Sequence, residues 1–170
     1  MDNRNERERF FGVEHGTTIR QDAPETPVLK VKLLHDDAVI PVKAHATDSG
    51  FDLYTCSETI IEPQSSGIAK TGLAIQLPFG YELVVRPRSG ISTKTPMRVI
   101  VGTVDCGYTG EIGIIVDNPT NARMVIAKGT KLAQGVIQHV PQMTVVVVDE
   151  LEDTERGGGG FGSTGGFANG

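Results

Sequence analysis

Short runs of β-branched and other apolar residues recur along the chain from Val28 onward. They are separated by Gly, Pro, Asn and Asp, the residues that favour turns. The runs read VLKVKLL, ETIIE, GLAIQLP, YELVV, RVIVGTV, EIGIIV, ARMVIA and TVVVV. Short strands bounded by turn residues in this way are typical of antiparallel sheets. The pattern therefore predicts a single all-β domain with the architecture of a β-sandwich or jelly roll.

Helical spacing of apolar residues is absent over any long window. The best candidate is a short turn near residues 89–94, which follows a proline. An α/β fold, in which helices alternate with strands, is therefore disfavoured.

The two ends of the chain differ from its middle. Residues 1–27 are polar and mix acids with arginines, a composition that buries too little apolar surface to order itself. After about residue 150, an acidic stretch gives way to GGGGFGSTGGFANG, which has high backbone freedom. We expect a flexible leader over 1–27, one domain over 28–150 and a mobile arm over 151–170.

Charge and cysteine content narrow the class of protein. The 170 residues carry a formal net charge of −5, whereas a general nucleic-acid binder depends on an excess of Lys and Arg. The apolar runs are too short to span a membrane, and the charged start lacks the apolar stretch of a signal peptide. Cys56 and Cys106 show no CxxC spacing, which favours reduced thiols. We expect a cytoplasmic protein that binds neither nucleic acid nor membranes.

Four polar clusters interrupt the apolar runs, and the glycine-rich arm forms a fifth. The four cover residues 47–52, 86–90, 102–110 and 129–134. Each alone has a structural explanation as a turn or a helix cap. Arg88, Ser89 and Gly90 would also offer a guanidinium fork, a hydroxyl and a close backbone approach to a phosphate. Asp105 could act as a general base in a cleft or simply be a solvated turn residue.

The arm has some features of a phosphate-binding loop. Gly157 and Gly162 have the Walker spacing, and Ser163 and Thr164 follow. The Walker lysine is missing, and such a loop must open onto a helix in an α/β sheet. These differences exclude a P-loop NTPase.

Taken together and in this order, the five clusters resemble the five signature motifs of the trimeric dUTPases, over about residues 28–165. The resemblance implies a homotrimer with active sites shared between subunits, in which the arm of one subunit closes over another. It also implies Mg²⁺-dependent hydrolysis of dUTP to dUMP and pyrophosphate by attack of water on the α-phosphorus. Such an enzyme keeps uracil out of DNA and supplies dUMP for thymidylate synthesis.

The resemblance assigns a role to individual residues. Asp105 matches the aspartate that activates water, and Asp52 matches an aspartate that supports the site. The implied phosphate contacts are Arg88, Ser89, Gly90, Gln134, Arg156, Ser163 and Thr164. The implied deoxyuridine contacts are Gly102, Thr103, Val104, Tyr108, Phe161 and Gly162. Magnesium is expected to be held by the substrate phosphates and by waters, without a direct protein ligand.

Within these motifs, backbone groups of residues 102–104 would read the uracil edge, and Tyr108 would stack on deoxyribose and disfavour a 2′-hydroxyl. Phe161 would cover the uracil. The sequence departs from the family pattern at Phe51, where tyrosine is more usual, and at Thr130, where aspartate is common. The second departure puts any role of that aspartate in doubt.

Two other functions fit parts of the sequence. A dCTP deaminase would share the fold, but its signature has a second serine where this chain has Gly90. A non-catalytic protein that senses dUTP would keep the pocket without turnover, against which Asp105 and the arm argue. Residues 1–27 lie outside the resemblance and are either an inert leader or a site for a regulatory partner. The four histidines share no spacing, so we assign them no role.

Overall fold

The structure is a computed structural model that describes residues 27–159 of the chain. Two compact units meet at the Val140–Pro141 bond, Met1–Val140 and Pro141–Gly170. That division comes before the boundary near residue 150 expected from the sequence. The leader falls almost wholly outside the described residues, as does the end of the arm, so the three predicted segments stay a prediction.

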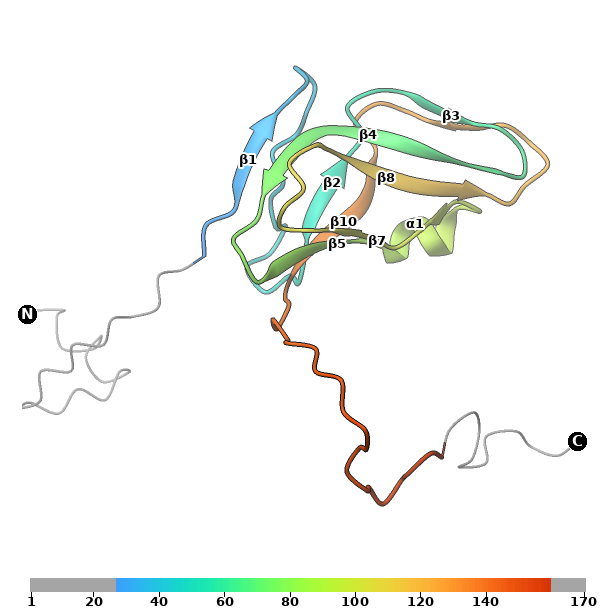
Figure 1. The fold of residues 1–170 in the computed structure, drawn as a ribbon. Coiled ribbons are helices and arrows are strands. Elements are labelled where there is room, and N and C mark those ends of the chain that lie inside the picture. The colour runs from blue at the N-terminus through green and yellow to red at the C-terminus, as the bar shows by residue number, and fades with distance from the viewer. Residues whose placement is uncertain (1–26, 160–170) are drawn as a thin grey trace, which may run out of the picture. The chain divides into compact units, whose positions relative to one another are not determined.

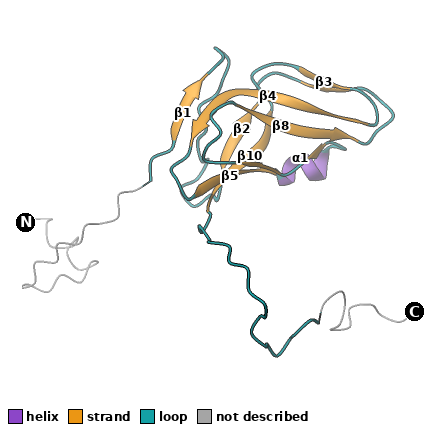
Figure 2. Cartoon of the chain, viewed as in Figure 1, coloured by secondary structure: helices purple, strands orange, loops and turns teal. Residues whose placement is uncertain are grey.

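The described part of the first unit is built from strands, with one short helix (Figures 1 and 2). The strands are β1 (Lys30–Leu33), β2 (Phe51–Tyr54), β3 (Thr59–Ile61), β4 (Ser65–Gln76), β5 (Tyr81–Pro87), β6 (Arg98–Val99), β7 (Gly102–Val104), β8 (Glu111–Asn118), β9 (Met124–Ile126) and β10 (Lys131–His139). The helix α1 covers Ser89–Lys94 and directly follows β5. The all-β class predicted from the sequence is confirmed.

The strands form two four-stranded sheets and a separate pair. One sheet has the order β1-β4-β8-β6, the other has the order β2-β10-β5-β7, and β3 pairs with β9. All of these pairings are antiparallel. Figure 1 shows the sheet of β1, β4 and β8 lying over the sheet of β2, β10 and β5. The arrangement is a β-sandwich whose connections run back and forth between the two layers.

The core lies between the sheets and follows the two-residue period of strands. On β8, Ile112, Ile114 and Val116 are almost fully buried, while the intervening Ile115 is exposed. The facing sheet contributes Leu53, Leu83, Val85, Leu132 and Ala133 to the same cluster. Residues that alternate with these on β2, β5 and β10 must therefore point to the outer face of the second sheet.

A buried amide stabilises the β3–β9 end of the sandwich. Asn118 is fully buried, and its Nδ2 donates to the carbonyl oxygens of Ile61, Glu62 and Ala122 at 3.1, 3.0 and 2.9 Å. Its Oδ1 accepts hydrogen bonds from the backbone N and the hydroxyl of Thr120. The side chain thus joins the ends of β3 and β8 to the turn that leads into β9.

Two details of the sequence-based expectation change. The polar clusters around Asp52 and Gln134 lie on strands, β2 and β10, and do not merely interrupt strands. The run TVVVV, expected to be a strand, forms none in the structure. A strand exists through hydrogen bonds to a neighbouring strand, and the described part of this single chain does not supply one to residues 144–148.

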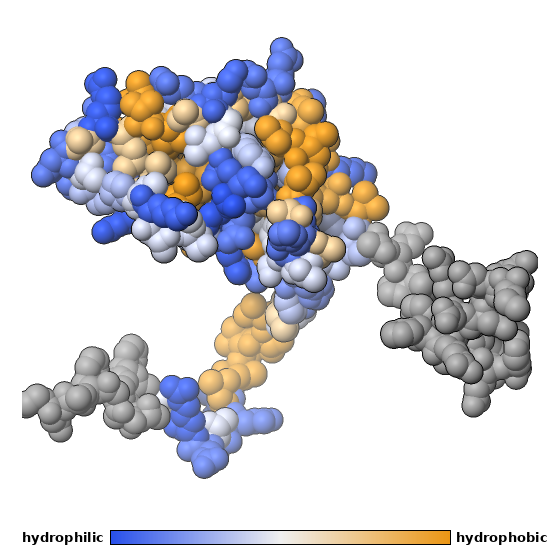
Figure 3. Space-filling model, turned by 180° about the vertical axis from the view of Figure 1, so that it is seen from behind, coloured by the Kyte–Doolittle hydropathy of each residue, from blue (hydrophilic) through white to orange (hydrophobic). Residues whose placement is uncertain are grey.

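The second unit has neither helix nor strand over residues 141–159. Its first half is apolar and exposed: Met143 is 80% exposed and Val147 is 94% exposed. Acidic residues follow, and Figure 3 shows the change from apolar to hydrophilic along this stretch. In the described range 27–159, no helix is long and apolar enough to cross a membrane.

Candidate active site

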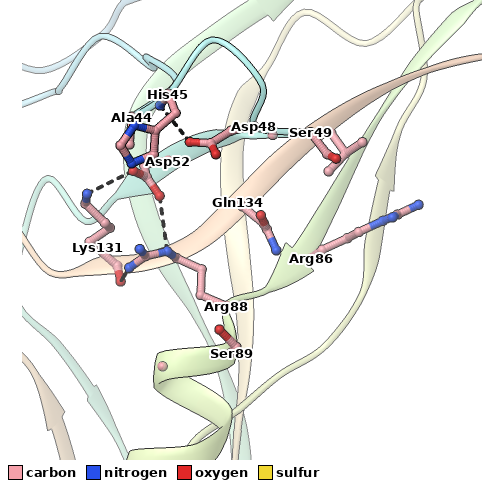
Figure 4. A pocket seen from close by; sticks show the side chains of 13 residues that line it. Ala44, His45, Asp48, Ser49, Asp52, Arg86, Arg88, Ser89, Lys131 and Gln134 are labelled. Atoms are coloured by element: carbon pink, nitrogen blue, oxygen red, sulfur yellow. Dashed lines mark hydrogen bonds and ion pairs between the residues drawn. The ribbon is translucent and has the colours of Figure 1, made fainter.

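A polar pocket of about 560 Å³ lies on the outer face of the second sheet (Figure 4). It is lined by residues from three of the polar clusters identified in the sequence, including Asp52, Arg88, Ser89, Gly90 and Gln134. These five come from β2, from the junction of β5 with α1, and from β10. The structure therefore brings together predicted site residues that are far apart in the sequence.

The register of the sheet explains why these side chains meet. Gln134 on β10 is the direct partner of Asp52 on β2 and of Arg86 on β5. Cross-strand partners project to the same face, with Cβ atoms roughly 5 Å apart. One polar row, Asp52–Gln134–Arg86, therefore crosses three strands on the side away from the core.

Two cations hold the carboxylate of Asp52. Its Oδ1 lies 3.1 Å from Nε of Arg88, and its Oδ2 lies 2.9 Å from Nζ of Lys131. The Asp52 side chain is only 14% exposed, whereas about a third of each cation side chain is exposed. Hydrogen bonding to Asp52, and to a smaller extent to Tyr54, raises the pKa of Lys131 above its ordinary value of 10.5. Lys131 is therefore charged at neutral pH and shares the carboxylate with Arg88.

The pairing of Asp52 with Arg88 and Lys131, called the clamp below, fixes the orientation of the Arg88 side chain. Its Nε is held by Asp52, and its Nη1 donates to the backbone oxygen of Lys131 at 3.2 Å. Among the described residues no further bond from this guanidinium is found, so the remaining N–H groups are available to an anion. Gln134 is oriented as well, because its Nε2 donates to the carbonyl oxygen of Pro87 at 3.0 Å. The two predicted phosphate contacts are thus preorganised by neighbouring residues.

Ser89 and Gly90 form the first turn of α1. Both are exposed at the pocket, and apart from its chain neighbours and the backbone of its own helix no atom lies within 4 Å of where a Gly90 side chain would begin. The Thr95 N–H donates to the carbonyl oxygen of Ile91 and closes the last turn of this short helix. The pocket therefore has unfilled space beside the Ser89 hydroxyl.

The predicted base and sugar residues lie elsewhere. Thr103, Val104, Asp105 and Tyr108 line a second pocket, of about 220 Å³, that shares no lining residue with the first. Val104 pairs with Leu83 on β5, and Arg88 lies five residues beyond Leu83. At the usual strand rise this separation is roughly 17 Å. Within one chain, Asp105 and Arg88 are too far apart to act on one phosphorus atom.

The second pocket is formed by β7 and the turn after it. The turn is closed by a hydrogen bond from Tyr108 N to Asp105 O at 3.0 Å. The Tyr108 hydroxyl donates to the carbonyl oxygen of Glu111 at 2.9 Å, which leaves the ring half-exposed. That ring lies over Gly110, where a Cβ would meet the hydroxyl at 2.5 Å. Glycine at this position therefore permits the ring to close over the turn.

Thr130 has a structural role in this chain. Its hydroxyl donates to the carbonyl oxygen of Ala127 at 2.6 Å, and its backbone N–H donates to the hydroxyl of Thr55 at 3.0 Å. The turn also uses Gly129, whose φ of +76° is in the left-handed region. Thr130 does not line the first pocket, so the residue that replaces the more usual aspartate secures the start of β10.

The arm is represented only by its first part. Arg156 is exposed, and its Nε donates to the carbonyl oxygen of Gly159 at 2.8 Å. The predicted contacts Phe161, Gly162, Ser163 and Thr164 lie outside the described residues, and their roles stay predictions.

The first pocket is also lined by residues to which the sequence assigned no role, among them Arg86, Lys131 and His45. Alternation along β5 could have indicated Arg86, because it stands two residues before Arg88 and shares its face. Lys131 lies in the same cluster as Gln134. His45 carried no such signal: its backbone N–H donates to Asp48 Oδ2 at 2.8 Å, a loop contact.

Comparison with known proteins identifies the family. A family model described as dUTPase matches residues 36–165. The chain is 44% identical over 139 residues to the deoxyuridine 5′-triphosphate nucleotidohydrolase of Nautilia profundicola, covering 81% of this chain and 98% of that protein. It is 45% identical to the enzyme of the same name from Clostridioides difficile, covering 81% of this chain and 97% of that protein.

Solved structures agree with the sequence comparison. A mutant Staphylococcus bacteriophage 80alpha dUTPase with dUpNHpp superposes with a TM-score of 0.78 at 32% identity, covering 82% of this chain and 99% of that chain. A mutant dUTPase from phage phi11 of S. aureus, described with a structural Mg(II) ion, has a TM-score of 0.70 at 30% identity, covering 74% of this chain and 99% of that chain. On its fold, its motifs and these relatives, the chain belongs to the dUTPase family.

Proposed function

We propose that this protein hydrolyses dUTP to dUMP and pyrophosphate. The observation that carries the proposal is the first pocket, where Arg88, Ser89, Gly90 and Gln134 meet beside the clamped Asp52 carboxylate. Guanidinium, hydroxyl and amide donors on one open surface suit a chain of phosphate oxygens. The relatives named as deoxyuridine 5′-triphosphate nucleotidohydrolases support the same substrate.

In the proposed reaction, Arg88, Ser89 and Gln134 hold the triphosphate in place. Asp105 takes a proton from a water whose oxygen attacks the α-phosphorus. The bond between that phosphorus and the bridging oxygen breaks, and pyrophosphate leaves with the electron pair. Arg88 and Arg156 offset the charge that develops on the phosphate oxygens.

The distance between the two pockets supports a shared site in a homotrimer. Asp105 and Arg88 of one chain lie at opposite ends of β5, so a complete site takes Asp105 from a neighbouring subunit. The exposed valines at 145–148 support assembly as well, because so much apolar surface favours burial against another chain. The arm would then close over a bound nucleotide with Arg156 and the predicted contacts beyond it.

Selection of the nucleoside is proposed for the second pocket. β7 is the last strand of its sheet, paired on one side with β5 and with no strand on its other side among residues 27–159. The outward N–H and C=O groups of residues 102–104 are therefore free to hydrogen-bond the uracil edge. The Tyr108 ring stands at the same pocket, where it would pack against deoxyribose.

Magnesium fits the first pocket as a partner of the substrate. Both oxygens of Asp52 are engaged by cations, so this carboxylate is not a free metal ligand. Described residues 27–159 contain no group of three or more metal-binding side chains. Phosphate oxygens and waters would then hold Mg²⁺, in keeping with its reluctance to dehydrate. The ion would neutralise phosphate charge when bound.

The experiment that tests the function measures pyrophosphate release with Mg²⁺ from dUTP, UTP, dTTP and dCTP. We expect release from dUTP alone, falling about 10²- to 10⁴-fold in Asp105→Asn. The Asp105 side chain is exposed and forms no hydrogen bond or ion pair with other described residues, so the isosteric change should leave the fold intact. Binding of dUTP without any release by the wild type would instead favour a nucleotide sensor.

A further inference from the structure

Arg86 has no assigned role, yet it completes the polar row on the outer face of the second sheet. It pairs across the ladder with Gln134, on the side of Gln134 opposite to Asp52. Figure 4 shows its side chain leaving β5 beyond Gln134 and away from the Asp52–Arg88 pair. Arg86 and Arg88 both line this pocket, and in Figure 4 their side chains lie on the two sides of Gln134.

The charges of the pocket leave Arg86 without a counter-ion. Asp52 is shared by Arg88 and Lys131, and Asp48 accepts a hydrogen bond from the His45 backbone. In the part of the chain that the structure describes, Arg86 forms no ion pair and no side-chain hydrogen bond, although its side chain is partly buried. Arginine keeps its charge at all ordinary pH values, and partial burial removes some of its hydration. The site therefore favours an anion against this guanidinium.

We propose that Arg86 is a phosphate-binding residue that grips the part of the triphosphate beyond the α-phosphate. The inference rests on the proposed function. Residues two apart on a strand are about 6–7 Å apart, so Arg86 and Arg88 can hold different phosphates of one chain. A guanidinium binds phosphate oxygens by paired N–H donors, and the β- and γ-phosphates carry most of the substrate's charge.

An acidic peptide segment is the competing occupant. The residues after Val148 include Asp149, Glu150, Glu152, Asp153 and Glu155. A carboxylate from such a segment would balance the charge of Arg86 as well as a phosphate would. The nearby Ser89 hydroxyl, Gly90 backbone and Gln134 amide favour a ligand rich in oxygen atoms instead. The two occupants can be distinguished by measuring whether the loss of Arg86 weakens the binding of a nucleotide with more phosphates.

The test compares calorimetric binding of dUpNHpp, with Mg²⁺, and of dUMP to wild type, Arg86→Gln and Arg86→Lys. We expect Arg86→Gln to weaken dUpNHpp binding about 10- to 100-fold and to leave dUMP binding unchanged. Arg86→Lys should restore part of the affinity, because it returns the charge without the fork. Arg123→Gln is the matched control, since Arg123 is exposed and pairs with Glu62 outside both pockets.

Each outcome decides the inference. Equal dUpNHpp affinity of Arg86→Gln and wild type would overturn it, because Arg86 would then contribute nothing to phosphate binding. An equal loss for dUMP and dUpNHpp would also overturn it, because the contact would not lie beyond the α-phosphate. A wild type that neither binds dUpNHpp nor hydrolyses dUTP would refute the proposed function first and this inference with it. If the wild type hydrolyses dUTP and Arg86→Gln binds dUpNHpp as tightly as the wild type does, only this inference is refuted.

Discussion

Mixing two inactive variants tests whether one active site draws Arg88 and Asp105 from different chains. Arg88→Ala removes the guanidinium at the first pocket, and Asp105→Asn removes the general base at the second. The roughly 17 Å of β5 between Arg88 and Leu83, the partner of Val104, prevents Arg88 and Asp105 from serving one phosphorus atom within one chain. Each variant alone should therefore be inactive, while a mixed trimer contains sites with both residues intact.

The expected recovery follows from counting. A site is intact when its Arg88 comes from an Asp105→Asn chain and its Asp105 comes from an Arg88→Ala chain. With equal amounts and random assembly each condition holds for half of the sites, so about a quarter of all sites are intact in a cyclic trimer. The mixture should reach about 25% of wild-type turnover.

The assay unfolds the two variants together in urea, refolds them and measures pyrophosphate release from dUTP. Each variant refolded alone, and wild type refolded in the same way, serve as controls. Recovery near a quarter of the refolded wild type is the predicted result. If the mixture stays as inactive as its components while size-exclusion chromatography shows mixed trimers, Arg88 and Asp105 act in the same chain and our reasoning is wrong.

Three further predictions concern the clamp and the core. Asp52→Asn can no longer pair with both cations, so kcat/KM for dUTP should fall about 10- to 100-fold in steady-state assays; an unchanged value would contradict the clamp. Asn118→Ala leaves buried carbonyls unpaired and should lower the free energy of unfolding by about 2–4 kcal/mol in urea titrations, whereas the exposed Asn121→Ala should change it by less than about 0.5 kcal/mol. Because the pKa of Lys131 is raised, its pairing stabilises the protein below 10.5 and is lost as pH rises through the folded-state value. The stability difference between wild type and Lys131→Met should therefore be smaller at about pH 11 than at about pH 8, and a constant difference would count against the pairing.

The strand pattern could be predicted from the sequence wherever strands are mostly apolar. β8 alternates buried and exposed residues and contains the run EIGIIV, so its periodicity is plain. β2 and β10 were not predicted as strands, because their outward residues Asp52 and Gln134 are polar and line the pocket. The run at 144–148 has strand composition, but composition does not supply a partner strand.

The motif residues of the first pocket could be named from the sequence, whereas the residues that hold them in place could not. Arg88, Ser89, Gly90 and Gln134 line one pocket in the structure, and their roles as phosphate contacts stay predictions. The partnership of Lys131 with Asp52 depends on how β10 lies beside β2, and no local pattern fixes that register. The distance between Asp105 and Arg88 likewise comes from the pairing of β7 with β5.

The exposed valines of the second unit have a consequence for handling the protein. Five consecutive β-branched residues without a proline, at 144–148, are the composition that stacks into cross-β aggregates. The acidic stretch that follows at 149–155 acts as a gatekeeper, because repulsion between negative charges opposes stacking. Salt shortens the range of that repulsion, so free chains should aggregate through this segment more readily at about 1 M salt than at about 0.01 M salt. Buffers of low ionic strength keep the repulsion effective.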